Sequence, residues 1–338
     1  MNYIEKSDIR SMVMNDAEWC NHLGFSDFEG LNNIIRQGRS IQLVNLCEAR
    51  HENRFSEIAG RIMEQNSVKL VLLAGPSSSG KTSTSLRVAL QCKVHGLNPK
   101  TIELDNFFVE REDTPKLPDG QYDYDCLEAM DIQLLNDKLT GLLTGQKVEL
   151  PRFDFIEGKK KFEGNYMKLE KNDVLILEGI HALNPAMTPA IPEDLKFLIY
   201  VSDVSSISNY DPSMRTTDNR LLRRIVRDSI KRGHNAEDTI LGWPNVRKGE
   251  EKFIFPLQEK ANMVFNSTTQ YELPLLKHYV TPLLRNIDEN SAAFPEAQRM
   301  LGFLNKIDAL PIDAISAIPC SSIIREFIGG QILSRDLL

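Results

Sequence analysis

The sequence predicts an α/β fold in which a doubly wound, mainly parallel sheet carries helical extensions at both ends. Two observations predict it. Short apolar runs alternate with helix-like segments between residues 67 and 287, the pattern of a parallel sheet covered by helices. The flanking segments place apolar residues at helical spacing instead. We therefore expect an N-terminal helical extension (1–66), a central domain (67–287) and a C-terminal helical extension (288–338).

The elements follow in order along the chain. Helical spacing marks the N-terminal extension at Leu31, Ile34, Ile35, Ile58, Ile62 and Met63. A buried parallel strand is predicted at residues 68–74, and further strands at 100–104, 173–177, 196–201 and 262–265. Helices are predicted at 83–95, from about 127, and at about 293–307. The stretch 106–127 is rich in acids and prolines, and we interpret it as an active-site loop rather than a linker.

Residues 75–82 fit the pattern G-x-x-x-x-G-K-[ST] of a phosphate-binding P-loop. An apolar run precedes this loop and a helix-like segment follows it, as the motif requires. Backbone N–H groups of such a loop and its helix point at nucleotide phosphates. Lys81 would reach the β- and γ-phosphates, and the Thr82 hydroxyl would bind Mg²⁺. The predicted ATP-binding residues are Gly75, Pro76, Ser77, Ser78, Ser79, Gly80, Lys81, Thr82 and Ser83.

The composition of the chain limits which kinds of molecule it is expected to bind. The formal net charge of −7 argues against a nucleic-acid-binding surface over most of the chain. The five cysteines are scattered without a CxxC pair, which favours a reducing compartment over a disulfide framework or a zinc site. No signal pattern and no apolar run of membrane-spanning length is visible. We expect a cytoplasmic protein that binds small molecules, neither nucleic acid nor membrane, and a homo-oligomer is compatible with the sequence.

Two acids follow predicted strands. Asp105 comes after the second strand, and ligands of open α/β sheets sit beyond the carboxyl ends of strands. Facing a γ-phosphate, it would accept the proton of an attacking hydroxyl, although alone it would equally suit a helix cap. Glu178 ends the strand at 173–177 and is predicted to hold Mg²⁺, directly or through water. His181 is predicted to pack or form hydrogen bonds rather than bind a metal, because no second histidine lies at ligand spacing.

An arginine-rich helix is predicted between residues 219 and 234. Four guanidinium groups share one face at i, i+3, i+4 and i+7, carried by Arg220, Arg223, Arg224 and Arg227. Such a run is often a solvated surface, but in an acidic chain it suits a lid that closes over phosphates and excludes water. Nearer the middle of the chain, Asp123 and Asp125 alternate with tyrosines, including Tyr122. They would bind sugar hydroxyls and cover a ring, or form a plain acidic loop.

Together these residues resemble the uridine kinase and phosphoribulokinase family of P-loop kinases. The resemblance spans about Val68 to Ile287 and rests on GPSSSGKT, LDNFF, QYDYD, PRFDF, VLILEGI and RLLRRIVRDSIKRG in the family's order. It implies a nucleoside-kinase-like P-loop fold, with transfer of the ATP γ-phosphate to a primary hydroxyl in the presence of Mg²⁺. The typical acceptor is the ribose 5′-hydroxyl of uridine or cytidine. The segments 31–66 and 318–330 resemble extensions in longer bacterial proteins of the family.

The resemblance assigns roles by position. Asp105 resembles the catalytic base, Asp125 the ribose-binding aspartate and Glu178 the acid associated with magnesium. Arg224 and Arg227 resemble lid arginines that act in catalysis with Lys81, and Arg232 resembles a further arginine on the phosphate side. Together with Arg220 and Arg223, Arg232 completes the predicted lid. The implied substrate-binding residues are Asp125, Tyr122, Phe153, Arg224 and His234.

Departures from the family pattern fall on nucleoside contacts. Phe153 stands where uridine kinases carry tyrosine, Gly158 or a neighbour where they carry a base-reading histidine, and His234 where they carry arginine. A glutamine further on has no equivalent near Gly242-Trp243. Because a polar recognition group can contribute orders of magnitude to selectivity, these changes leave the acceptor open.

Two alternatives remain open at the level of the sequence. The basic residues Arg152, Lys159 and Lys160 would favour an anionic acceptor, so the chain could phosphorylate another hydroxylated metabolite, such as a sugar phosphate or a vitamin alcohol. Alternatively, ATP binding could order the lid and engage a partner, as in a non-catalytic switch. Asp105 and Asp125 favour a kinase, since a switch needs no acceptor pocket.

Overall fold

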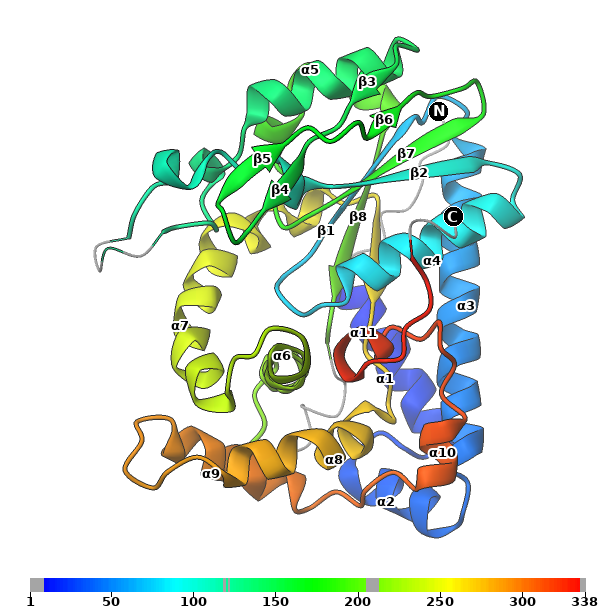
Figure 1. The fold of residues 1–338 in the computed structure, drawn as a ribbon. Coiled ribbons are helices and arrows are strands. Elements are labelled where there is room, and N and C mark those ends of the chain that lie inside the picture. The colour runs from blue at the N-terminus through cyan, green and yellow to red at the C-terminus, as the bar shows by residue number, and fades with distance from the viewer. Residues whose placement is uncertain (1–8, 118–119, 121, 205–212, 335–338) are drawn as a thin grey trace.

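The computed structural model describes residues 9–117, 120, 122–204 and 213–334. A five-stranded parallel sheet stands at its centre (Figure 1). Its strands are β1 (Leu70–Ala74), β2 (Asn98–Glu103), β7 (Asp173–Glu178), β8 (Lys196–Ser202) and β9 (Met263–Asn266). Each lies within two residues of a predicted strand, so the α/β fold class is confirmed.

Strand order positions the site. The sheet runs β2-β7-β1-β8-β9, with β1 between β7 and β8. In the register, Leu73 of β1 lies opposite Glu178 of β7, and Glu103 of β2 lies opposite the same residue. Because all strands are parallel, the segments that follow β1, β2 and β7 leave the sheet at one edge. The P-loop, Asp105 and Glu178 therefore come from neighbouring strand ends.

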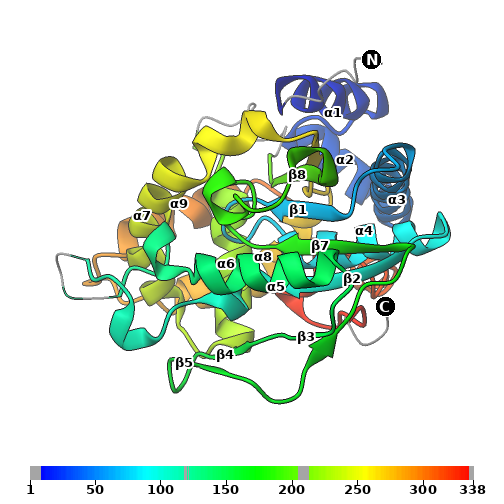
Figure 2. The ribbon, with the colours of Figure 1, turned by 90° about the horizontal axis from the view of Figure 1, so that it is seen from above.

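Helices cover both faces of this sheet (Figures 1 and 2). In chain order they are α1 (Ile9–Leu23), α2 (Phe28–Arg36), α3 (Ser40–Glu64), α4 (Lys81–Val94), α5 (Ile132–Leu143), α6 (Asp218–Lys231), α7 (Ala236–Phe253), α8 (Glu272–Arg285), α9 (Phe294–Leu304), α10 (Ile312–Ser316) and α11 (Arg325–Ile328). Helix α3 packs against α4, and α6 packs against α7, α8 and α11.

The pleat of β1 divides the core in two. Val71 and Leu73 point into a cluster formed with α3, α4, α6 and α8, while Leu70 and Leu72 point into a second cluster with α5. Alternate residues of a strand face opposite sides, so a strand covered on both faces is apolar throughout. The first cluster also contains Leu31 and Phe303, and so joins residues of all three predicted regions. The boundaries predicted at residues 66 and 287 therefore separate segments of the chain that share one hydrophobic core.

Two features differ from the prediction. The helix expected from about residue 127 begins at Ile132, because Asp131 accepts a hydrogen bond from the Leu134 N–H at 3.0 Å and caps it there. A short 3₁₀ turn, Leu127–Ala129, precedes it. The sequence also gave no indication of two small antiparallel pairs, β3 (Val148–Glu149) with β6 (Tyr166–Met167) and β4 (Arg152–Asp154) with β5 (Lys159–Lys161).

Across the described ranges, none of the helices combines the length and apolar character that crossing a bilayer demands. Residues 1–8, in which the sequence predicts no signal pattern, lie outside those ranges.

Candidate active site

The P-loop has the backbone geometry that its motif requires. Gly80 adopts φ +82° and precedes the first residue of α4, Lys81, a conformation that glycine adopts without strain. At Gly75, a Cβ atom would stand 2.2 Å from the Val201 carbonyl oxygen, so only glycine fits between β1 and β8. The loop therefore turns tightly from β1 into the N-terminus of α4, where helix N–H groups favour an anion.

Unsatisfied polar groups in this loop fit a phosphate. The buried hydroxyls of Ser78 and Ser79 have no hydrogen-bond partner among the described residues. The Lys81 ammonium group donates to the Pro76 carbonyl at 3.1 Å and so lies back over the loop. Burial lowers the pKa of Lys81, while the charges of Glu178 and Asp105 raise it. A lysine surrounded by these groups can bind phosphate oxygens.

Thr82 and Glu178, the two predicted magnesium ligands, are hydrogen-bonded to each other. The Thr82 hydroxyl donates to Glu178 Oε1 at 3.0 Å, and the Glu178 side chain is buried at the end of β7. A hydroxyl and a carboxylate oxygen are ligands that Mg²⁺ accepts, and Mg²⁺ in such sites keeps several waters besides phosphate oxygens. The pair therefore fits a magnesium ion bound directly or through water.

Asp105 lies on the same side of the site. It belongs to a 3₁₀ turn, Leu104–Phe107, that follows β2 directly, and its side chain is exposed. Burial lowers the pKa of Lys81 and of Arg232, and the negative charge of Asp105 opposes that shift at both groups. Asp105 therefore lies close enough to the P-loop lysine and to Arg232, just after α6, to interact with their charges.

Asp125 lies across a small hollow from the P-loop. The hollow, about 20 Å³, is lined by Ser77, Asp125, Ile180, Val246, Gly249, Glu250 and Ile254. A Cβ atom on Gly249 would stand 3.1 Å from Asp125 Oδ2, so α7 passes close to this carboxylate. Burial of the Asp125 carboxylate raises its pKa, and the negative charge of Asp123 raises it further. The positive charge of Arg224 opposes this shift.

Arg220 and Arg223 are not placed as a lid, which corrects the prediction. Both side chains are buried and donate to P-loop carbonyl oxygens, Arg220 to Ser77 at 3.0 Å and Arg223 to Ser78 at 3.3 Å. Arg220 is ion-paired with Glu250, and Arg223 with Glu272 and Asp203. Charges that are buried and paired in this way are fixed in place. These two residues therefore hold the P-loop backbone in place through its carbonyl oxygens.

Three other arginines do face the site. Arg224 donates to the Ser77 hydroxyl at 2.7 Å, and its neighbour along the helix, Arg227, is paired with Asp228 at 2.8 Å. Asp228 is buried and also lies within 4 Å of the guanidinium groups of Arg224 and Arg232, at 3.4 Å and 3.7 Å. Three guanidinium groups thus surround one carboxylate at the end of α6. The cluster has a net positive charge and can bind an anion.

The remaining predicted acceptor residues are spread more widely. Phe153 is buried in β4 and packs edge-on against Phe108 and Phe155. The Lys116 ammonium nitrogen lies 5.1 Å from the centre of the Tyr122 ring, and the His234 side chain is exposed just after α6. His181 is buried edge-on against Phe253, as predicted. The geometry therefore brings the phosphate-side residues together more closely than the acceptor-side ones.

Two carboxylates at the P-loop were missed by sequence reasoning. Glu250 accepts hydrogen bonds from the Ser77 N–H at 3.0 Å and from Arg220, and Glu326 accepts from the Ser83 N–H at 3.1 Å. Their separations from the loop, 173 and 243 residues, explain why no local pattern pointed to them.

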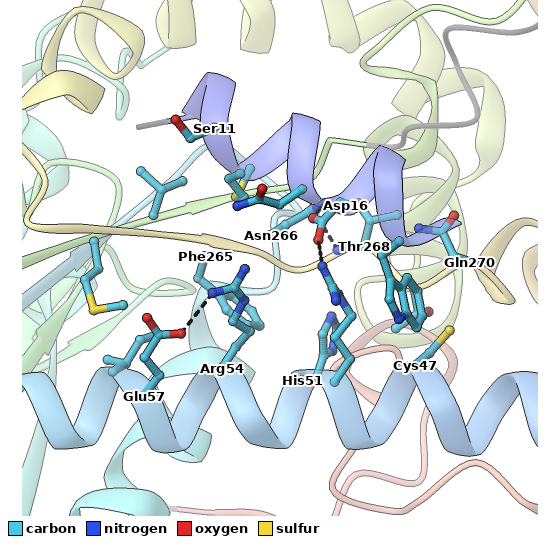
Figure 3. A pocket seen from close by; sticks show the side chains of 18 of the residues that line it. Ser11, Asp16, Cys47, His51, Arg54, Glu57, Phe265, Asn266, Thr268 and Gln270 are labelled. Atoms are coloured by element: carbon cyan, nitrogen blue, oxygen red, sulfur yellow. Dashed lines mark hydrogen bonds and ion pairs between the residues drawn. The ribbon is translucent and has the colours of Figure 1, made fainter. Parts of the chain in front are cut away.

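A larger cavity of about 540 Å³ lies elsewhere, between α1, α3 and β9 (Figure 3). Asp16 binds Arg50 at 2.6 Å and Asn266 at 2.7 Å across it, and Arg54 is paired with Glu57. None of the predicted site residues lines this cavity.

Comparison with known proteins agrees with this geometry. Residues 70–274 match the profile of the Phosphoribulokinase / Uridine kinase family. A uridine kinase of Halobacterium salinarum is 29% identical over 193 residues, which are 57% of this chain and 77% of the relative. A uridine kinase of Ligilactobacillus salivarius is 28% identical over 225 residues, 65% of this chain and 96% of the relative.

Among solved structures, D-glycerate 3-kinase of Cryptococcus neoformans is 14% identical, with a TM-score of 0.39, over 59% of this chain and 88% of that chain. The family profile covers more than half of the sequence and includes the P-loop, Asp105, Glu178 and the α6 arginines. The chain therefore belongs to the phosphoribulokinase / uridine kinase family of P-loop kinases and is a phosphotransferase with an alcohol group as acceptor.

Proposed function

We propose that this protein transfers the γ-phosphate of ATP to the ribose 5′-hydroxyl of uridine or cytidine. The observation that carries the proposal is the grouping of Lys81, Thr82, Glu178 and Asp105 at one edge of the sheet, with Asp125 across the hollow from Ser77. The relatives named above that share this part of the chain are uridine kinases.

Each residue has a role that follows from its position. Lys81 and the N-terminus of α4 bind phosphate oxygens, and the cluster around Asp228 faces the charge that develops on the transferred group. Asp105 accepts the proton of the acceptor hydroxyl as its oxygen bonds to phosphorus and the bond to ADP breaks. Thr82 and Glu178 would hold Mg²⁺, which would supply positive charge to the nucleotide phosphates.

We infer that the acceptor is a neutral molecule. Two of the basic residues that would suit an anionic acceptor are paired with acids, Lys160 with Asp131 at 2.5 Å and Arg152 with Glu163 at 3.8 Å. A buried phenylalanine at position 153 offers no polar group to a base. A second candidate follows from this observation: a kinase of another neutral, hydroxylated metabolite, with relaxed recognition of the base.

The test is a panel of acceptors. We would measure ADP formation with Mg²⁺ and ATP against uridine, cytidine, other nucleosides, ribulose 5-phosphate and pantothenate, with each product identified by mass spectrometry. We expect phosphorylation of uridine or cytidine at the 5′-hydroxyl. Phosphorylation of a different acceptor alone would support the second candidate. ATP binding without any phosphorylated product would favour a nucleotide-dependent switch.

Asp105→Asn tests the mechanism in the same assay. We expect turnover to fall on the order of 10² or more, because the amide cannot take the proton, while the Kd for ATP stays nearly unchanged. Asp113→Asn is the matched control, since Asp113 is an exposed acid of the same loop. Unchanged turnover in Asp105→Asn would remove this residue from the mechanism.

A further inference from the structure

The segment from Cys320 to Gln331, which includes α11, docks at the N-terminal end of the P-loop helix. In Figure 1, α11 lies beside α6 and near the start of α4. The buried guanidinium group of Arg87 in α4 donates to the Ser321 carbonyl at 2.5 Å. At the far end of the segment, Gln331 Nε2 donates to the Ser83 hydroxyl oxygen at 2.9 Å. Both ends of the segment are therefore attached to α4.

Between these attachments, Glu326 binds the donors of the first turn of α4. A single carboxylate oxygen of Glu326 accepts from the Ser83 N–H at 3.1 Å and from the Ser83 hydroxyl at 2.5 Å. Lys81 and Arg223 also experience the charge of Glu326. The carboxylate thus occupies the anion position that a helix N-terminus creates.

Under the proposed function, this position is needed by the nucleotide. The N–H groups of a P-loop and its first helical turn bind the α- and β-phosphates of the nucleotide. The Ser83 N–H has one proton and its hydroxyl has one, and both are directed at Glu326. An α-phosphate at the same donors would also be repelled by the Glu326 charge. Glu326 and an α-phosphate therefore exclude each other at Ser83.

Apolar contacts hold the segment in place. Ile323 packs so closely on Gly80 that a Cβ atom there would stand 2.6 Å from the Ile323 Cγ2 methyl group. The Phe327 ring lies 5.0 Å from the Arg223 guanidinium carbon, and both side chains are fully buried. The ribose and base attached to an α-phosphate at Ser83 must pass this end of α4.

We propose that residues 320–331 are an internal competitor of the nucleotide, with the Glu326 carboxylate standing in for the α-phosphate. Nucleotide binding then requires this segment to leave Ser83. The apparent affinity for ATP is lower than the intrinsic affinity by the fraction of molecules in which the segment is released. The inference depends on the proposed nucleotide site and adds a regulatory element to it.

Two measurements test the inference. The first is the Kd of Mg·ATP for the wild-type chain and for Glu326→Gln, which keeps the shape of the side chain but removes its charge. We expect the variant to bind about tenfold more tightly, because the amide is a weaker acceptor for the Ser83 donors. Asp313→Asn is the matched control: Asp313 is an exposed acid of α10, and its replacement should leave the Kd unchanged.

The second measurement needs no variant. Backbone N–H groups of Glu326, Phe327 and Ile328 donate to Ile323 and Ile324, so they are protected from hydrogen exchange while α11 is formed. We expect saturating Mg·ATP to reduce protection in residues 320–331 of the wild-type chain. The inference is overturned if the Kd is equal in wild type and Glu326→Gln, or if protection persists with ATP bound. Failure of both proteins to bind Mg·ATP overturns the inference and the proposed function together.

Discussion

Asp125 is an acceptor-side carboxylate whose charged form is disfavoured by its surroundings. Burial removes water from its carboxylate, and the negative charge of Asp123 repels the ionised form. Both effects raise the pKa of Asp125, so it takes up a proton at a higher pH than an ordinary aspartate. Only the ionised form offers two strong acceptors to ribose hydroxyls. Acceptor binding should therefore be lost as the pH falls through this raised pKa.

We predict that Asp125→Asn raises the acceptor KM at neutral pH on the order of tenfold, because a charge-assisted hydrogen bond is replaced by a weaker one. In wild type, the acceptor KM should rise as the pH falls toward the pKa of Asp125. The measurement is the pH dependence of KM for the acceptor identified in the panel. Asp123→Asn sharpens the test: without that neighbouring charge the rise should move to lower pH. An unmoved profile would show that Asp125 is not the titrating group.

At the scale of elements, α6 and α7 are joined to the P-loop by one buried carboxylate. Glu250 of α7 accepts from the Ser77 N–H, from Arg220 of α6 and from Arg247 at 2.8 Å. The Arg220 guanidinium group also stacks 5.3 Å from the Trp243 ring. A fully buried arginine without its acid would leave an uncompensated charge in the core. The position of the nucleotide loop therefore depends on a helix far from it in sequence.

Glu250→Gln should reduce the free energy of unfolding by about 3 kcal/mol, since it leaves Arg220 buried without a counter-charge. Glu251→Gln is the matched control at the next position. Its exposed carboxylate pairs with Arg247 at 3.1 Å, a surface contact that contributes less than about 1 kcal/mol. Chemical denaturation of the three proteins would measure the difference. Equal losses from the two variants would contradict the role given to Glu250.

At the scale of the whole molecule, a buried polar triad joins the two extensions to the central domain. Glu48 of α3 accepts from the hydroxyl of Tyr271, which precedes α8, and from the Ser322 hydroxyl at 2.7 Å. Burial and the charge of Glu48 raise the pKa of Tyr271 well above its ordinary value. The phenol therefore remains protonated and keeps donating. The triad fixes how the three predicted regions pack together.

We predict that Tyr271→Phe destabilises the protein by roughly 1–3 kcal/mol, because the buried Glu48 carboxylate loses a donor. Tyr279→Phe, at a half-buried position later in α8, should change the free energy of unfolding by less than about 0.5 kcal/mol. Urea denaturation compares the two variants directly. A similar, small effect in both would mean that the triad contributes little to stability.

Local signals predicted the parts of this molecule that local chemistry determines. The strand, loop and helix around Lys81 are consecutive, and four of the five sheet strands, all except β2, are mainly apolar runs that can be recognised one by one. The order of those strands was not predictable, because it depends on pairing between distant segments. The roles of Arg220 and Arg223 were misjudged for the same reason: their acid partners Glu250 and Glu272 lie 30 and 49 residues away. An arginine face looks alike whether it meets solvent or buried carboxylates.

The long separation between Ser83 and Glu326 also has a consequence in time. Their 243-residue spacing means that, at about 5–20 residues added per second, about 12–49 s pass on the ribosome between the synthesis of one and of the other. During that interval the first turn of α4 can meet nucleotide before its own carboxylate partner exists. A chain that binds nucleotide after Glu250 of α7 has fixed the P-loop, but before Glu326 is made, would carry nucleotide from the outset. Glu326 would then compete for the Ser83 donors only after this first nucleotide has dissociated.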